Sequence, residues 1–316
     1  MRKWPFFNLG DKQGMQVIYK MDVVFLWIYS AIICIIGIIG AISLKNILFL
    51  GIMLVVELIY LLFALKRPYR RSRAVKKEFP QEWKNFLLEH SIFYRNIDEK
   101  SKRHFERDVQ IFLSDFSVEG TRRQSVDMET KLLVASGVAA LLHGRPFWEP
   151  PFQDGVVIYP GERFNRHYQT GKGNFAGQAS YHGPLILTEG GLEESFKHPH
   201  DGYNVIYHEM AHYFDFEDGS AEGIPAARMG AQKLYSWKNI FLKEWQKALQ
   251  GRSFLRSYAG KNEAEFFAVA AESFFEKPWE MKEKNPELYD ALKDFFNIDT
   301  IHIIKPTITS LRINDE

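Results

Sequence analysis

The sequence predicts an α+β domain that is preceded by a two-helix transmembrane hairpin. Two long apolar runs near the N-terminus, separated by a short polar break, indicate the hairpin. Downstream, several segments show the spacing of amphipathic helices, and two short β-branched segments are bounded by turn residues. The chain has 316 residues, of which 46% are hydrophobic and 25% are charged, and this is the composition of a folded protein.

The transmembrane hairpin is expected over residues 23–65. Residues 23–43 carry no formal charge, a polar break interrupts the run, and residues 47–65 are apolar again except for Glu57. Each run is about the length that a helix needs to cross a hydrocarbon core of ~30 Å. The alternative is a pair of buried core helices, but such helices would be unusually long and nearly free of polar faces.

Basic residues flank the hairpin and predict its orientation. Residues 1–22, the expected cytoplasmic N-terminal segment, and residues 66–79, the expected basic linker, are both rich in Lys and Arg, whereas the turn between the spans has only Lys45. The positive-inside bias therefore predicts a multi-pass protein of the cytoplasmic (inner) membrane with both ends in the cytoplasm. The linker could also bind anionic lipid or nucleic acid, but a solvated topology signal is the simpler interpretation. Its basic residues are Lys66, Arg67, Arg70, Arg71, Arg73, Lys76 and Lys77.

Charge and cysteine content exclude some classes of function. The formal net charge is +1, so no direct nucleic-acid binding is expected. Cys34 is the only cysteine, so no disulfide within the chain and no cysteine-based zinc site can form. Glu57, near the middle of the second span, is costly there unless it is protonated or paired. A structural, hydrogen-bonded role for Glu57 is favoured over a functional membrane site.

Residues 80–316 are expected to form the soluble domain, and its first part is predicted to be helical. Residues 79–102 and then 103–116 show the apolar spacing of amphipathic helices. Asp127 can cap a third helix, which is rich in Ala, Val and Leu, is therefore central, and ends at residues 144–146.

Two strands, three helices and a terminal strand are predicted in the rest of the domain. Residues 156–159 and 184–188 are the strands, and the glycine-rich segment between them is a loop. The second strand is expected to align an extended peptide by backbone pairing, with an ordinary internal strand as the alternative. Asp201 and Asn204 can cap the next helix. Further elements are expected at residues 232–249 (helix), from Asn262 through Phe275 (helix) and after Ile301 (a terminal strand).

The most informative motif is H-E-x-x-H at residues 208–212. His208 and His212 are four residues apart, so they project from one face of a helix and both imidazoles can reach one metal ion. Glu209 points to the neighbouring face, from which it can hold and deprotonate a water on the metal. A surface helix with solvated histidines is the alternative, but the flanking residues are largely apolar, and buried polar groups need partners.

The residues alone offer two candidates for the third ligand that a catalytic zinc usually has. Asp218 lies ten residues after His208, a spacing that one class of zinc hydrolases uses, although that class requires glycine where this chain has Asp215. Glu265 lies on a separate, later helix, although Asn262 and Glu265 also form a plausible N-cap and N3 pair.

A resemblance favours Glu265. Residues 208–215 with 218–219, and residues 262–268, resemble the Mlc titration factor A family of zinc-dependent peptidases. The second segment, with Ser257 and Tyr258 before it, is also similar to the metalloprotease domain of anthrax lethal factor. The likeness runs from about residue 80 to 295, and the hairpin lies outside the common family pattern. It implies a zincin-like fold of the gluzincin type, Zn²⁺ as cofactor and a peptide or protein substrate.

Carried over by residue, the resemblance implies that His208, His212 and Glu265 bind zinc and that Glu209 is the general base. Tyr258, seven residues before Glu265, would hydrogen-bond the oxyanion, and a core tyrosine is the alternative for it. Asp215 would either orient the His212 imidazole as a hydrogen-bond acceptor or lie solvated at the helix end.

The sequence therefore predicts a zinc metallopeptidase that is anchored in the lipid bilayer with its catalytic domain in the cytoplasm. The alternative is a regulatory binding protein that sequesters a transcriptional regulator, as the family name implies, with a mainly structural zinc site. Glu209 and Tyr258 favour an enzyme, because a structural site needs neither residue.

Overall fold

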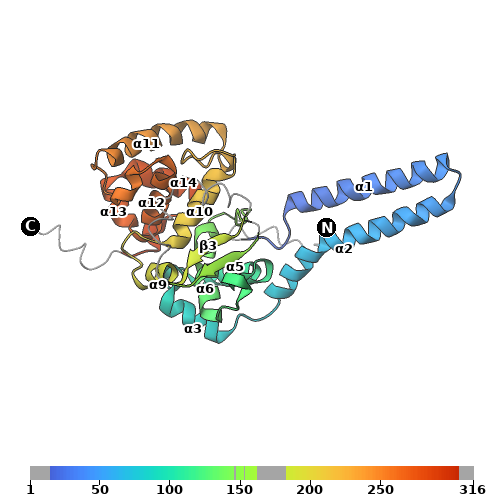
Figure 1. The fold of residues 1–316 in the computed structure, drawn as a ribbon, viewed down its shortest axis with the longest axis horizontal. Coiled ribbons are helices and arrows are strands. Elements are labelled where there is room, and N and C mark those ends of the chain that lie inside the picture. The colour runs from blue at the N-terminus through green and yellow to red at the C-terminus, as the bar shows by residue number, and fades with distance from the viewer. Residues whose placement is uncertain (1–14, 146, 153, 162–182, 306–316) are drawn as a thin grey trace, which may run out of the picture.

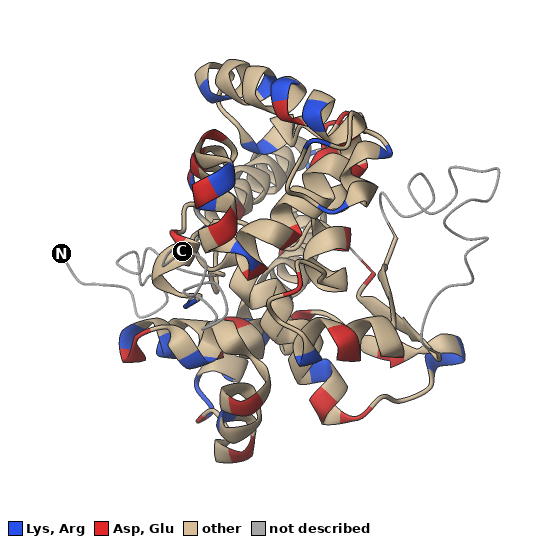
Figure 2. Ribbon diagram, turned by 90° about the vertical axis from the view of Figure 1, so that its left-hand side faces the viewer, with Lys and Arg blue, Asp and Glu red and all other residues tan. Residues whose placement is uncertain are grey.

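A helical hairpin projects from one side of a mostly helical domain that contains a small sheet (Figure 1). The computed structural model describes residues 15–145, 147–152, 154–161 and 183–305. In the view of Figure 2, basic and acidic residues are interspersed over the helices of the domain.

The hairpin consists of α1 (Lys20–Ser43) and α2 (Ile47–Val75), which lie side by side (Figure 1). The break between them falls at residues 44–46, as predicted, and Asn46 caps α2 by accepting a hydrogen bond from the Leu48 backbone N–H. Both helices are long and apolar enough to cross a membrane, and almost none of their apolar side chains is buried. This exposure distinguishes them from the core helices of a soluble domain.

The solvated basic linker that the sequence predicted is in part a buried junction. Helix α2 continues to Val75, and only 1% of the Arg71 side chain is exposed. Arg71 donates hydrogen bonds to Asp115 (2.7 Å) and to Glu149 (3.0 Å), and Arg67 and Arg70 also pair with Asp115. Burial alone would raise the pKa of Asp115, but the Arg71 and Arg67 guanidinium groups outweigh it and hold that pKa below its usual range. The base of the hairpin is therefore part of the folded domain.

The first helical part of the domain divides into three helices where the sequence predicted two. They are α3 (Gln81–His90), α4 (Ile92–Asn96) and α5 (Glu99–Asp115). Helices α4 and α5 begin at N-caps that the apolar spacing did not reveal. The Ser91 hydroxyl accepts a hydrogen bond from the Tyr94 N–H at the start of α4. An Asp98 carboxylate oxygen accepts from the Lys100 and Ser101 N–H groups at the start of α5. The predicted central helix is α6 (Met128–Leu142), and Asp127 caps it as expected.

The sheet has three parallel strands in the order β1 (Val118–Gly120), β2 (Val156–Tyr159) and β3 (Leu185–Thr188). Both predicted strands are confirmed, whereas β1 is too short to leave a pattern in the sequence. Most of the predicted loop before β3 lies outside the described residues. Residues 306–316 of the predicted terminal strand also lie outside them. The start of that strand is not extended, because Thr300–His302 forms a 3₁₀ turn.

The core lies where α6, α10 (Val205–Phe216) and α12 (Glu263–Glu276) pack together. Gly137 on α6 permits this close approach, because a Cβ at that position would lie 2.6 Å from Ile206 Cδ1 on α10. Thus α10 is held from one side by α6 and from the other by α12. Within the described residues, the other α-helices are α9 (Glu189–Lys197), α11 (Ala231–Leu249, predicted as 232–249), α13 (Pro278–Lys284) and α14 (Pro286–Phe296).

Candidate metal centre

Helix α10 presents the two motif histidines on a partly accessible face. Asn204 caps the helix as predicted, accepting hydrogen bonds from the Ile206 and Tyr207 backbone N–H groups. The other predicted cap, Asp201, instead accepts from Tyr203 N–H (2.8 Å). Ile206, Met210 and Phe214 are fully buried, whereas the side chains of His208 and His212 remain 12% and 17% exposed. The apolar face thus fixes the helix, and the histidines are left free to meet a ligand.

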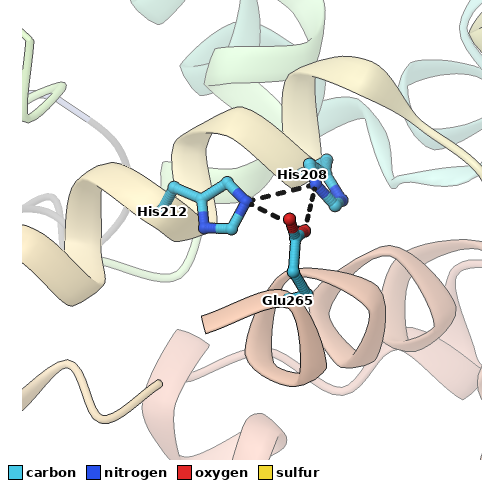
Figure 3. Close-up of side chains that lie close together, drawn as sticks. All are labelled: His208, His212 and Glu265. Carbon is cyan, nitrogen blue, oxygen red and sulfur yellow. Dashed lines mark hydrogen bonds and ion pairs between the residues drawn. The ribbon is translucent and has the colours of Figure 1, made fainter. Parts of the chain in front are cut away.

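Glu265 reaches the same point from α12. Its backbone N–H donates to Asn262 Oδ1 (2.9 Å), so Asn262 caps this helix as predicted. The Glu265 carboxylate does not turn back to the cap; it points across to the imidazoles of α10 (Figure 3). The two interpretations of Glu265 in the sequence are therefore compatible, because capping uses its backbone and the side chain stays available.

The three side chains bring one donor atom each to a common point. Glu265 Oε2 lies 3.1 Å from His208 Nε2 and 3.3 Å from His212 Nε2, and the two nitrogens are 3.2 Å apart (Figure 3). A tetrahedral ion with ligand bonds of about 2.0–2.1 Å requires donor separations of roughly 3.3–3.4 Å. Two imidazole nitrogens and one carboxylate oxygen at this spacing form a possible site for one metal ion.

The electrostatics at this point favour a cation. Burial lowers the pKa of His208, but the Glu272 and Glu265 carboxylates outweigh burial and raise that pKa to about 10. Burial likewise raises the pKa of Glu265, but the two histidines outweigh it and hold that pKa far below its usual range. The carboxylates around the imidazoles therefore stabilise positive charge at the centre of the triad.

Asp218, the other candidate for the third ligand, lies elsewhere. Its side chain is exposed, and Oδ1 accepts hydrogen bonds from the Ser220 backbone N–H (2.9 Å) and hydroxyl (2.8 Å). Among the described residues, the only group of three potential metal ligands brought together is His208, His212 and Glu265.

Tyr258 lies at the edge of the triad, and Glu209 follows His208 directly on α10. Tyr258 stands in the 3₁₀ turn Ser257–Gly260, and its hydroxyl donates to Glu265 Oε1 (2.9 Å). Lys261 Nζ donates to both the Tyr258 hydroxyl (2.9 Å) and Glu265 Oε1 (3.0 Å). Glu209 is partly exposed, and its charge contributes to the raised pKa of His208. Tyr258 is therefore more than a core aromatic side chain, because its hydroxyl faces the site.

The sequence profile of the glucose-regulated metallo-peptidase M90 family matches residues 66–297, which include all of these side chains. The chain belongs to the M90 family. The match begins within α2, so the M90 domain includes the buried end of the hairpin around Arg71.

The relatives confirm the resemblance to Mlc titration factor A. The protein of that name from Pectobacterium atrosepticum is 30% identical over 164 residues, which cover 48% of this chain and 61% of the relative. That from Edwardsiella ictaluri is 33% identical over 135 residues, which cover 40% and 50%. This chain therefore spans about half to three-fifths of these relatives. "Uncharacterized protein slr2042" of Synechocystis sp. is 27% identical over 251 residues, which cover 74% of this chain and 90% of the relative.

Two contacts in the M90 domain escaped the sequence analysis. Glu272 lies 2.8 Å from His208 Nδ1 through its Oε1 atom, and Arg256 pairs with the same carboxylate. The only signal in the sequence was the spacing of Glu272, two helical turns after Glu265 and hence on the same face of α12.

Neither prediction for Asp215 is correct. Its side chain is fully buried and accepts hydrogen bonds from the backbone N–H groups of Gly223 (2.9 Å) and Ile224 (2.6 Å). Burial outweighs these bonds and raises the pKa of Asp215 to about 6. Gly223 has a φ of +68°, and a Cβ there would lie 2.3 Å from the Glu263 carbonyl oxygen. Asp215 therefore secures the loop after α10 against the start of α12.

Proposed function

We propose that this chain is a membrane-anchored, zinc-dependent metallopeptidase with a zincin-like domain of the gluzincin type. The observation that carries the proposal is the triad of His208, His212 and Glu265, whose donor atoms lie 3.1–3.3 Å apart. When bound, zinc would act as a Lewis acid that polarises a peptide carbonyl and lowers the pKa of water, so that water can be deprotonated for attack at neutral pH.

The residues of the chain divide the other tasks. Glu209 takes the proton of the attacking water and returns it to the leaving amine. The Tyr258 hydroxyl donates to the carbonyl oxygen as negative charge develops there. To do so, the Tyr258 hydroxyl must exchange its present acceptor, Glu265 Oε1, for the substrate oxygen.

Strand β3 is suited to hold the substrate. Among the described residues it pairs with β2 on one side and has no strand on the other. The Tyr213 hydroxyl on α10 donates to the Pro184 carbonyl (2.7 Å), which fixes the start of β3 against the motif helix. We propose that an extended peptide pairs with this edge and so lies alongside the metal centre.

Metal removal tests the proposed reaction. The full chain, purified in detergent, is expected to carry about one zinc, as one set of three ligands implies, and to cleave members of a diverse peptide library. A strong chelator should abolish cleavage, and added Zn²⁺ should restore it. Cleavage that persists in metal-free protein, confirmed by elemental analysis, would show that the activity does not depend on this centre.

A second candidate function follows from the relatives, whose name, Mlc titration factor A, says that they titrate Mlc. This chain would then bind a transcriptional regulator, and its zinc would be mainly structural. Glu209 and Tyr258 argue against that function, since a structural site requires neither a base nor an oxyanion donor. Absence of cleavage in the zinc-loaded chain, together with binding to a regulator, would favour it.

The positive charge on both sides of the hairpin supports a cytoplasmic orientation of the domain. Protease added outside intact spheroplasts should therefore leave residues 80–316 uncut, whereas protease added after lysis should digest them. Digestion of the domain in intact spheroplasts would reverse the proposed topology.

A further inference from the structure

Glu272 is a fully buried carboxylate that lies directly behind one of the candidate metal ligands. Its side chain is 0% exposed, and its Oε1 atom lies 2.8 Å from His208 Nδ1, the ring nitrogen that faces away from the triad. Burying a carboxylate is costly unless charge-assisted hydrogen bonds compensate for the lost water. Because burial of this carboxylate is costly, we expect it to have a role that an apolar side chain could not fill.

Arg256 supplies the compensation. Its Nη2 atom donates to Glu272 Oε1 (2.9 Å) and Oε2 (2.6 Å), and its Nε atom donates to Oε2 (3.0 Å). The same guanidinium lies over the rings of Tyr203 and Tyr258, at 5.3 and 5.2 Å from their centroids. Glu272 is therefore held in one geometry before it meets the imidazole.

The two candidate histidine ligands differ in their support. The His208 ring has Glu272 at Nδ1, whereas His212 Nδ1 is buried without a hydrogen-bond partner among the described residues. Asp215, which the sequence suggested as the support for His212, is engaged by backbone N–H groups instead. The His208 ring is thus anchored through a carboxylate at Nδ1, whereas the His212 ring has no such anchor at Nδ1 among the described residues.

We infer that Glu272 is the positioning residue of the metal centre, acting through His208. By accepting the Nδ1 proton, Glu272 leaves the lone pair on Nε2 and directs it toward Glu265 and His212, and its charge makes the imidazole a stronger donor. Arg256 holds the carboxylate in place with three hydrogen bonds. This inference rests on the proposed metal-binding role of the triad.

Two substitutions of Glu272 separate this role from a merely structural one. In Glu272→Gln, one acceptor oxygen becomes an NH₂ group, which must face a donor on either His208 or Arg256. In Glu272→Asp, the charge stays but the shorter side chain retracts from His208. Glu244→Gln is the matched control, because Glu244 is also buried (2% exposed) and bonded, to Lys247 and Asn285, but does not contact the histidines.

The measurement is the zinc dissociation constant of the full chain in detergent, by competition with a chromophoric chelator, beside the melting temperature of the metal-free protein. Both Glu272 variants should bind zinc about 10–100-fold more weakly than the parent, as is typical when the partner of a ligating histidine is lost. Glu244→Gln should bind zinc like the parent even where its melting temperature falls.

Parental zinc affinity in both Glu272 variants would overturn this inference and leave the proposed function intact. Failure of the parent itself to bind zinc would overturn both. A measurement on the parent covers the case in which the variants do not fold. In the zinc-loaded parent, NMR should show a strongly hydrogen-bonded Nδ1 proton on His208 and none on His212. The same signal on both rings, or on neither, would contradict the assignment.

Discussion

Glu209→Gln is expected to abolish detectable peptide hydrolysis while the chain retains about one zinc. Glutamine is nearly isosteric with glutamate but cannot accept the proton of the attacking water, and a positioned base typically contributes 10²–10⁴-fold to the rate. Zinc should remain, because Glu209 is not one of the three side chains that meet at the candidate site. Peptide cleavage and elemental zinc are measured on the same preparation.

Glu222→Gln is the control for this prediction, because Glu222 is an exposed glutamate outside the triad. That variant should match the parent in both measurements. Activity of Glu209→Gln within a few-fold of the parent would remove the proposed general base. Loss of zinc from Glu209→Gln would make its inactivity uninformative about proton transfer and would instead place Glu209 among the ligands.

Glu265→Ala is expected to lower zinc affinity by more than about 100-fold, beyond the range typical for loss of a residue that only supports a ligand. The substitution removes one of three donor atoms and leaves the helix start intact, since Asn262 bonds to the backbone N–H of residue 265. Asp218→Ala should bind zinc like the parent, because Asp218 is exposed and its carboxylate accepts hydrogen bonds from Ser220 rather than facing the triad. Zinc titration and thermal melts of both variants supply the test.

The opposite pattern would reassign the third ligand. Normal zinc binding by Glu265→Ala, with binding lost in Asp218→Ala, would require the loop after α10 to fold back to the histidines. A modest fall in melting temperature with unchanged zinc affinity in Glu265→Ala would reduce Glu265 to a helix-capping residue, for which about 1 kcal/mol is the usual loss.

The sequence predicted the features that depend on neighbouring residues. The apolar runs of the hairpin, the four-residue spacing of the histidines and the caps Asp127, Asn204 and Asn262 all act within a turn or two of the chain. Each is therefore visible without knowledge of the fold, and the structure confirms each as a local feature.

The features that were missed depend on partners far along the chain. Arg71 was assigned to a solvated linker because its partners, Asp115 and Glu149, are 44 and 78 residues away. Glu272 looked like any acidic residue of a helix until α12 packed against α10 and placed it behind His208. The spacing of Asp215 from His212 suggested that it supports that imidazole. In the structure its carboxylate instead accepts hydrogen bonds from the backbone N–H groups of the loop after α10.

The buried Arg71 has a practical consequence for anyone who wishes to separate the domain from the helical hairpin. A shortened chain that begins at residue 80 would lack all three arginines that pair with Asp115, whose side chain is only 2% exposed. Removing one partner of a buried ion pair costs about 3–5 kcal/mol, a large part of the roughly 5–15 kcal/mol that holds a typical domain folded. A water-soluble version should therefore discard the apolar spans but retain the last turns of α2.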